Sequence, residues 1–220
     1  MKDLNQLLLK FDLKQNYTSE DYYVSKSNFY AYNLINKWPN WEKNILNIHG
    51  DKFSGKTHLT NIFLKKFKAK RILANEFNDE CLKNFKIFEN LVLEDFNENI
   101  NERLMYSLFN IADQDNKYIV ISSLVPINQI NFKLEDLASR AKNCLFAKIE
   151  KPDDELIFAI LLKNFSDRQI LIEKKLIDFV IKHIDRSYEK IYEFIYKIDE
   201  LSLKKKKSID FKTIKEALKV

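Results

Sequence analysis

The chain has 220 residues, of which 45% are hydrophobic and 31% charged, and its formal net charge is +5. This length exceeds the roughly 100–200 residues of a usual single domain, so we expect one large domain or a domain with a small appendage. No stretch approaches the roughly 20 apolar residues that span a membrane, and the N-terminus lacks a signal-peptide layout. We therefore expect a cytoplasmic protein. Its mildly basic charge permits contact with nucleic acid or an acidic partner without indicating either.

Strand-like and helix-like patterns alternate through the first two thirds of the chain. The strand-like runs are apolar without polar alternation, and the helix-like segments between them are amphipathic. This combination is typical of a parallel sheet covered on both faces, so an α/β fold is predicted. The predicted strands are 45–49, 91–93, 118–121 and 144–149, and the predicted helices 28–38, 56–67 and 100–111.

Beyond Lys151 and Pro152 the pattern becomes purely helical. One of these segments, 187–201, carries its apolar residues on a single stripe, as a helix packed on a core does. We therefore predict a tail over 1–14, an α/β domain over 15–151 and a small all-α domain over 152–220. The helices predicted for the last domain are 153–165, 173–184, 187–201 and 210–218.

A phosphate-binding motif follows the first predicted strand. Residues 50–57 match G-x-x-x-x-G-K-[ST] between a strand and a helix, and the only two glycines of the chain occupy its glycine positions. Such a loop points backbone N–H groups and a helix N-terminus at an anion. We expect Lys56 to reach the β- and γ-phosphates and Thr57 to bind Mg²⁺. The predicted nucleotide-binding residues are Gly50, Asp51, Lys52, Phe53, Ser54, Gly55, Lys56, Thr57 and His58.

Two carboxylates end the second apolar run, where a P-loop protein needs an acid to hold the metal or orient a water. We predict that Glu94 is a metal ligand and Asp95 a catalytic residue. A strand that ends in a solvated acidic turn is the alternative interpretation. The usual order is Asp followed by Glu, and the reversed order here makes hydrolysis less assured than binding.

Read together, these segments resemble the AAA+ ATPases, and more narrowly the initiator-like branch that contains DnaA and its shortened regulatory homologue Hda. Ser123 stands at the sensor 1 position, where DnaA usually has Asp. The other matching segments are 22–28 beside the adenine, 38–41, the arginine-finger box 136–140 and the lid entry 151–155. The resemblance implies an AAA+ base with a helical lid.

The same resemblance assigns a role in trans to Arg140, which would stabilise charge on a neighbour's γ-phosphate. The sensor 2 arginine of the lid falls at about Glu189, so its cation is missing unless Arg186 or Lys190 replaces it. A DNA-reading helix-turn-helix is not expected after the lid. Sequence-specific duplex recognition is therefore not expected, and DNA contact should be indirect or weak.

The N-terminal tail resembles the short peptides that dock on the DNA-polymerase sliding clamp. In that reading Gln6 anchors the peptide by hydrogen bonds, and Leu7, Leu9 and Phe11 supply its apolar anchors. The alternative is that the apolar side chains pack on the domain.

The function expected from the resemblance is regulatory. The protein would bind ATP or ADP with Mg²⁺, sit on the DNA-loaded clamp and stimulate hydrolysis of the ATP bound to DnaA, with weak or no ATPase of its own. Its expected partners are DnaA and the clamp, and a homodimer is allowed. Two alternatives stay open: a DnaA-related loader or anchor that binds single-stranded DNA or a replication partner, and an autonomous ATPase. The two cysteines and three histidines show no metal-ligand spacing and are interpreted as structural.

Overall fold

The structure, a computed structural model, describes residues 21–205 and 209–218. Five parallel strands form one sheet in the order β2-β3-β4-β1-β5. The three inner strands are almost wholly buried, as their uninterrupted apolar runs predict. The strands are β1 (Ile45–His49), β2 (Lys70–Leu73), β3 (Asn90–Phe96), β4 (Tyr118–Ser123) and β5 (Leu145–Lys148).

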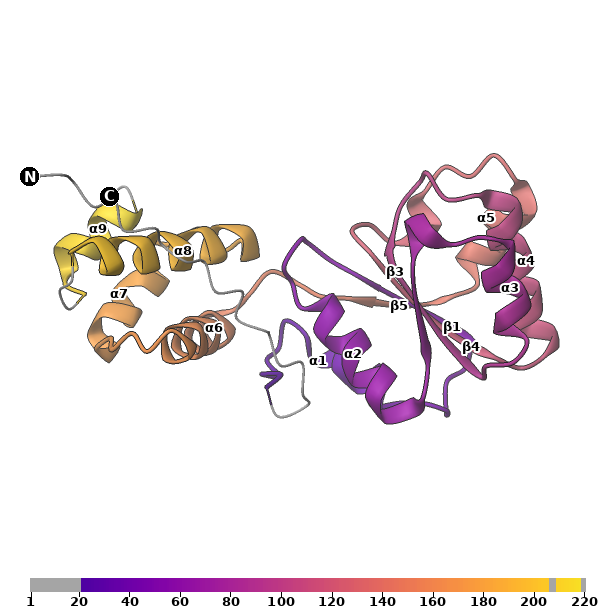
Figure 1. Cartoon of the computed structure of the whole chain (residues 1–220), viewed down its shortest axis with the longest axis horizontal. Coiled ribbons are helices and arrows are strands. Elements are labelled where there is room, and N and C mark those ends of the chain that lie inside the picture. The colour runs from indigo at the N-terminus through magenta and orange to yellow at the C-terminus, as the bar shows by residue number, and fades with distance from the viewer. Residues whose placement is uncertain (1–20, 206–208, 219–220) are drawn as a thin grey trace, which may run out of the picture.

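Helices cover both faces of this sheet (Figure 1). One core contains the apolar faces of α1 and α2 together with alternate strand residues such as Leu46 and Val92, and the other contains those of α3, α4 and α5. The expected parallel α/β architecture is thus confirmed. The bounds are α1 (Phe29–Lys37), α2 (Lys56–Phe67), α3 (Asp79–Phe85), α4 (Glu102–Gln114) and α5 (Glu135–Lys142), with 3₁₀ turns η1 (Ala74–Glu76) and η2 (Ile127–Gln129).

Strand β2 and helices α3 and α5 were not among the strands and helices predicted from the sequence. β2 lies at the edge of the sheet, where Lys70 and Arg71 are exposed and only Ile72 is buried. A charged edge strand of this kind carries no continuous apolar run, and lysine on an edge discourages further strand pairing. Helix α3 has seven residues, too few for a clear periodic pattern, although Asn78 caps it by accepting from the amides of Glu80 and Cys81.

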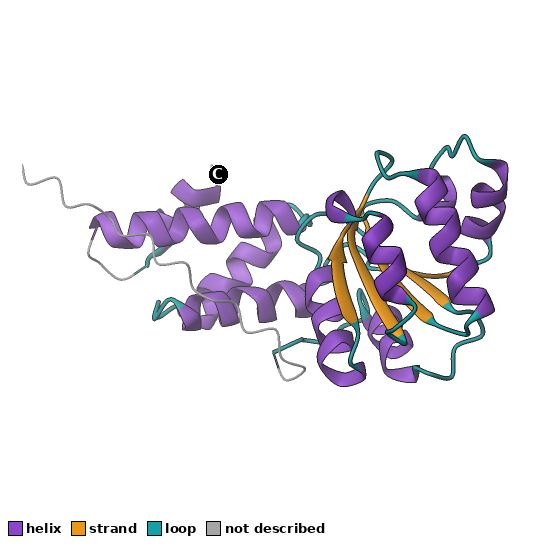
Figure 2. Ribbon diagram, turned by 45° about the vertical axis from the view of Figure 1, so that its right-hand side comes forward, coloured by secondary structure: helices purple, strands orange, loops and turns teal. Residues whose placement is uncertain are grey.

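Four helices follow the sheet and pack on a core of their own (Figure 2). Asp153 caps the first of them by accepting from the amide of Leu156. Among the described residues, every helix is too short or too polar to cross a bilayer. The helices are α6 (Asp154–Asp167), α7 (Lys174–His183), α8 (Tyr188–Lys205) and α9 (Phe211–Leu218).

Candidate functional site

The predicted phosphate loop lies between β1 and α2, at the edge of the sheet where the parallel strands end. Its backbone is unusual, because Gly50, Phe53 and Gly55 all have positive φ angles, of 157°, 64° and 94°. The chain turns here so that the first amides of α2 face the loop. These amides and the positive end of the helix dipole form an anion site.

The two glycines are required for different reasons. A Cβ on Gly50 would come within 2.9 Å of the Ile149 carbonyl oxygen, which is backbone and cannot move aside easily. Gly55 caps α2 with a φ of 94°, a left-handed conformation that residues with a side chain rarely adopt, whereas a Cβ there would make only an ordinary contact with the Tyr22 ring. Glycine at both positions is therefore a physical requirement of this loop.

Lys56 is the cation of the loop. Its side chain is buried, and Nζ donates to the carbonyl oxygens of Gly50 and Asp51, both at 2.8 Å. Burial lowers the pKa of the Lys56 ammonium, and the carboxylates of Asp95 and Asp51 oppose that shift. Nearby, Ser54 Oγ is buried with no hydrogen-bond partner in the described structure. The loop thus presents a poised cation and an unsatisfied hydroxyl, which fits a phosphate ligand.

The two carboxylates predicted at the end of β3 point to different places. Glu94 is buried, accepts a hydrogen bond from Thr60 Oγ1 on α2 and forms a 3.4 Å ion pair with Arg71 on β2. These partners were not predicted, because they come from elements distant in sequence. Glu94 is therefore engaged by two partners within the fold, whereas the side chain of Thr57 is exposed.

Asp95 is exposed and is re-aimed by an irregularity of the strand. The pairing of β3 with β4 shifts register between Leu93 and Phe96, and Asp95 adopts a φ of 56° while its amide donates to Ser122 Oγ at 3.2 Å. A bulge of this kind commonly turns a side chain toward a site. The negative charge of Asp95 raises the pKa of Lys56 against the effect of burial, so Asp95 interacts electrostatically with the phosphate loop.

Ser123, predicted as sensor 1, is tied into a buried polar network. Its hydroxyl accepts from Asn47 Nδ2 at 2.8 Å and donates to the Val125 carbonyl at 2.7 Å. Asn47 Oδ1 in turn accepts from the amide of Ile127 at 3.0 Å. Ser123 thus holds the loop after β4 in place. A single asparagine inside the apolar strand 45–49 was the signal that could have revealed this network.

The lid approaches the phosphate loop through aromatic side chains of α8. Tyr188 is buried against the sheet-bearing part, and its hydroxyl donates to the Glu150 carbonyl at 2.9 Å. One turn later the ring of Tyr192 lies 5.3 Å, centroid to centroid, from that of Phe53 in the loop. This contact between loop and lid was not predicted.

Neither proposed substitute for the sensor 2 arginine points at the loop. Arg186 pairs with Asp154 at 2.7 Å, and Lys190 pairs with Glu193 at 2.8 Å within α8. Both cations are satisfied by local carboxylates. In the described structure, α8 therefore meets the phosphate loop with an aromatic ring and not with one of these two cations.

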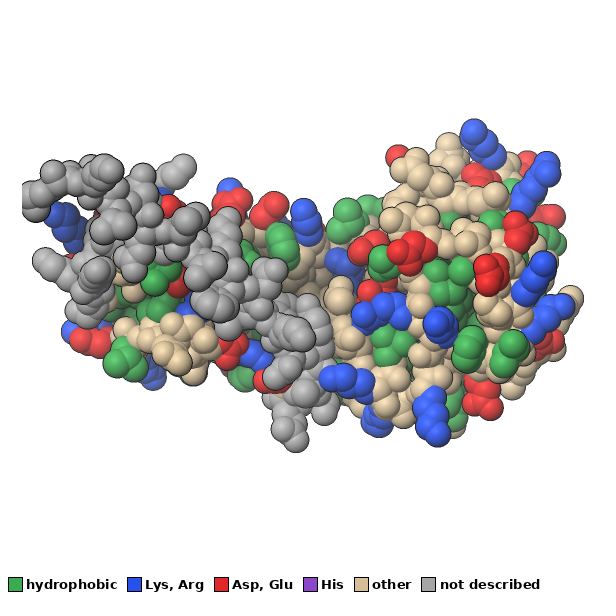
Figure 3. All heavy atoms as spheres, viewed as in Figure 1, with side chains coloured by type: hydrophobic (Ala, Val, Ile, Leu, Met, Phe, Trp, Pro, Cys, Tyr) green, Lys and Arg blue, Asp and Glu red, His purple; other side chains and the backbone are tan. Residues whose placement is uncertain are grey.

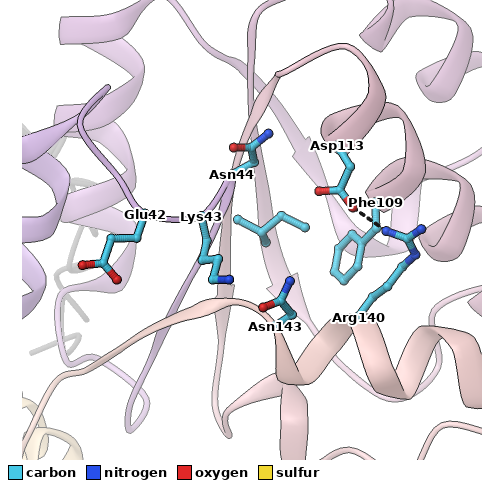
Figure 4. Close-up of a pocket in the computed structure, with 8 residues that line it drawn as sticks. Glu42, Lys43, Asn44, Phe109, Asp113, Arg140 and Asn143 are labelled. Carbon is cyan, nitrogen blue, oxygen red and sulfur yellow. Dashed lines mark hydrogen bonds and ion pairs between the residues drawn. The ribbon is translucent and has the colours of Figure 1, made fainter.

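Arg140 lies at the end of the sheet where the strands begin, opposite the phosphate loop. It projects from α5 into a pocket of about 170 Å³ and pairs with Asp113 on α4 (Figure 4). Its guanidinium also lies 5.4 Å from the centre of the Tyr106 ring. Asn44 and Lys43, which line the same pocket, directly precede β1.

The length of β1 separates Arg140 from the phosphate loop of its own chain. Five residues of strand, at about 3.3 Å per residue, span about 13 Å between first and last Cα atoms. An arginine side chain at one end cannot reach a phosphate at the other. If Arg140 contacts a nucleotide, that nucleotide belongs to another molecule.

No three His, Cys, Asp or Glu side chains within residues 21–205 and 209–218 form a ready-made metal cage. Mg²⁺ needs none, because in nucleotide sites it keeps water and phosphate oxygens as most of its ligands. The clamp-binding residues predicted in the tail, Gln6, Leu7, Leu9 and Phe11, lie outside the described residues.

The sheet order, the phosphate loop and the helical lid define an AAA+ fold with a P-loop. Comparison with solved structures agrees. Domain III of the replication initiation protein DnaA from Thermotoga maritima superposes with a TM-score of 0.72 at 23% identity, over 92% of this chain and 95% of that one. A DnaA bound to AMPPCP and single-stranded DNA gives a TM-score of 0.70 at 21% identity, over 89% and 70%.

Sequence comparison relates the chain to the same protein, DnaA. The chain is 30% identical over 200 residues to the chromosomal replication initiator protein DnaA of Borrelia duttonii, which covers 78% of this chain but only 41% of that protein. No protein-family model matches the chain. The chain is therefore a DnaA-related AAA+ protein that spans less than half of this relative.

Proposed function

We propose that this protein binds an adenine nucleotide and acts on DnaA, stimulating hydrolysis of DnaA-bound ATP while its tail holds it on the DNA-loaded sliding clamp. The observation that carries the proposal is the placement of Arg140 at the edge opposite the protein's own phosphate loop. A guanidinium in that position serves a second molecule. Within this proposal, residues 15–151 form the nucleotide-binding domain and 152–220 the lid.

The loop residues support nucleotide binding. Lys56 and the first amides of α2 would hold the phosphates, Thr57 would join the metal, and Asp95 is better placed than Glu94 to face them. A related fold has been solved with AMPPCP, a nucleotide analogue. Because Arg186 and Lys190 are engaged elsewhere, we propose that the bound nucleotide sets conformation and is hydrolysed slowly or not at all.

The proposed chemistry occurs on DnaA. Water attacks the γ-phosphorus of the DnaA-bound ATP, the bond to the bridging oxygen breaks, and ADP and phosphate are the products. Negative charge grows on the phosphoryl oxygens and the leaving ADP during this step. The planar fork of Arg140 would stabilise that charge with several hydrogen bonds at once.

A loader or anchor that binds single-stranded DNA is the second candidate, since one structural neighbour was solved with such a strand. The two functions differ in one measurable respect. A loader leaves the nucleotide on DnaA unchanged, whereas the proposed regulator converts it to ADP.

The decisive experiment follows radiolabelled ATP on DnaA with and without this protein and clamp loaded on DNA. We expect the DnaA-bound label to become ADP only when both are present. A Gln6→Ala, Phe11→Ala variant should lose clamp binding and this stimulation while keeping nucleotide affinity. Unchanged DnaA-ATP in the presence of the wild-type protein would contradict the regulatory function and favour the loader.

A further inference from the structure

Lysines gather at the edge of the sheet where β2, β3 and β4 begin. Lys37 ends α1, while Lys66 and Lys68 lie in the last turn of α2 and at its C-cap. Lys70 begins β2, and the other two lysines precede β3 and β4. We call this set the lysine edge: Lys37, Lys66, Lys68, Lys70, Lys86 and Lys117.

Hydrogen bonds tie neighbouring parts of the lysine edge together. Lys66 Nζ donates to Asn36 Oδ1 at 2.9 Å, which joins the end of α2 to the end of α1. Lys117 Nζ donates to the carbonyls of Lys86 at 3.0 Å and Phe88 at 2.7 Å, which joins the starts of β3 and β4. In Figure 3, blue side chains gather at the lower border of the sheet-bearing part, beneath α2.

The charges of the lysine edge are not neutralised locally. Within the described residues, none of its six lysines lies within ion-pair distance of a carboxylate. Lysines elsewhere do have such partners, as in Lys163 with Asp21 and Lys148 with Glu150, both at 2.6 Å. The segments that connect to β2, β3 and β4 contribute only Glu89 and Asp115 as carboxylates.

Two structural roles explain where these lysines lie, and their concentration at one end of the sheet follows from them. A lysine in the last turn of a helix offsets the negative end of the helix dipole, which accounts for Lys37 and Lys66. Lysine also protects an edge strand, which accounts for Lys70. Lys68 and Lys86 are the C-caps of α2 and α3, and Lys117 donates to the carbonyl of Lys86, so these three also lie at helix C-termini. The parallel topology has brought separate lysines to one surface, and that surface suits a polyanion.

We infer that the lysine edge binds the phosphate backbone of duplex DNA without reading its sequence. Ammonium groups act as point charges on phosphates, and released counterions drive such binding. The six lysines offer point charges and not the arginine fork that reads bases, so contact through them should be independent of sequence. The inference that the bound polyanion is a DNA duplex rests on the proposed function, because a protein held on a clamp around DNA lies beside a duplex.

The test is fluorescence anisotropy of a labelled short duplex at about 50 mM salt, without clamp or DnaA. The Lys66→Gln, Lys68→Gln, Lys70→Gln variant should bind at least about tenfold more weakly. The slope of log affinity against log salt should fall by about 2 to 3, since each phosphate contact contributes about 0.9. The matched control, Lys174→Gln, Lys175→Gln, Lys182→Gln on α7, removes equal charge far from the edge and should stay within about twofold of wild type.

Three outcomes would overturn the inference. The wild-type protein could show no duplex binding, the control variant could lose as much affinity as the edge variant, or the edge variant could bind normally. If the edge variant lowers DnaA-ATP hydrolysis although no duplex binds, the edge faces a protein and the inference is wrong. Duplex binding by a protein that never stimulates DnaA would uphold the lysine edge and contradict only the proposed function.

Discussion

The two ends of the same parallel sheet are built in different ways. Where the strands end, the backbone makes the site: glycines at positive φ, helix amides and a bulge at Asp95 lie around a phosphate position. Where the strands begin, side chains make the surface, with the lysine edge on one side and Arg140 in its pocket near β1 on the other. The first end suits a small anion held by the chain itself, and the second suits large charged partners.

This difference follows from the topology. In a sheet whose strands all run one way, every strand end lies at one edge and every strand start at the other. Helix N-termini therefore face the phosphate loop, and helix C-termini face the opposite edge, where cations are favoured. One molecule thus offers a phosphate site and a cationic surface about one strand length apart, and the proposed action in trans would use both.

The largest expected effect concerns Arg140. Arg140→Ala should lower the stimulated hydrolysis of DnaA-bound ATP by at least about 100-fold, because trans-acting arginines contribute about 10³ to 10⁵ in rate in well-studied GTPases. Single-turnover hydrolysis measures this directly. Arg140→Lys should rescue poorly, since an ammonium cannot reproduce the guanidinium fork.

Arg103, an exposed arginine on α4, gives a matched control for that measurement. Arg103→Ala removes the same charge but should leave the stimulated rate unchanged. Full hydrolysis with Arg140→Ala, or an equal loss with Arg103→Ala, would mean that Arg140 has no specific role. Nucleotide affinity of the protein itself should be the same for both variants.

At the phosphate end, Lys56→Ala should weaken ADP and ATP binding by at least about tenfold. The reason is that hydrogen bonds to charged groups are worth about 1.5–3 kcal/mol and the loop has no other buried cation. Titration calorimetry gives the affinity. Lys52→Ala serves as the control, because it keeps the backbone of the loop and removes only an exposed side chain, whose Nζ lies 5.4 Å from the centre of the Phe53 ring. Equal losses in the two variants would contradict the assignment of Lys56.

A smaller effect is expected where loop and lid meet. Phe53→Ala and Tyr192→Ala should each lower the stability of the nucleotide-bound protein, and a double-mutant cycle should give a coupling energy of about 0.5–1.5 kcal/mol. Thermal or urea unfolding with saturating nucleotide provides the numbers. Tyr196, one turn further along α8 and packed with Arg168, should show no coupling to Phe53. Additive effects of Phe53 and Tyr192 would show that the rings do not link loop and lid.

The smallest effect is expected for the reactivity of the Cys144 thiol, which reports on the packing around Arg140. Burial, and secondarily the charge of Asp113, raises the pKa of the Cys144 thiol to about 12, so this thiol stays protonated and unreactive near pH 8. A maleimide should modify the half-buried Cys81 first and reach Cys144 only on unfolding. Mass spectrometry of labelled peptides identifies the site. Rapid labelling of Cys144 in the folded protein would show that the packing around Arg140 is looser than described.

Local patterns predicted much of the fold. The apolar runs at β1, β3, β4 and β5 and the periodic segments of α1, α2 and the four lid helices all correspond to observed elements. They could be predicted because a strand buried on both faces must be apolar throughout, and an amphipathic helix must repeat every 3.6 residues. β2 escaped prediction because an edge strand is only partly buried and tolerates Lys70 and Arg71.

The phosphate loop was determined by the sequence itself, since two glycines, a lysine and a threonine at fixed spacing specify a backbone shape within eight residues. Tertiary structure decided everything that depends on distant partners. It placed Glu94 between Thr60 and Arg71, tied Ser123 to Asn47, and set Arg140 on Asp113. It also gathered the lysine edge from separate segments. A side chain's role depends on the charges and hydrogen-bond partners around it, and these come from strands and helices that only folding brings together.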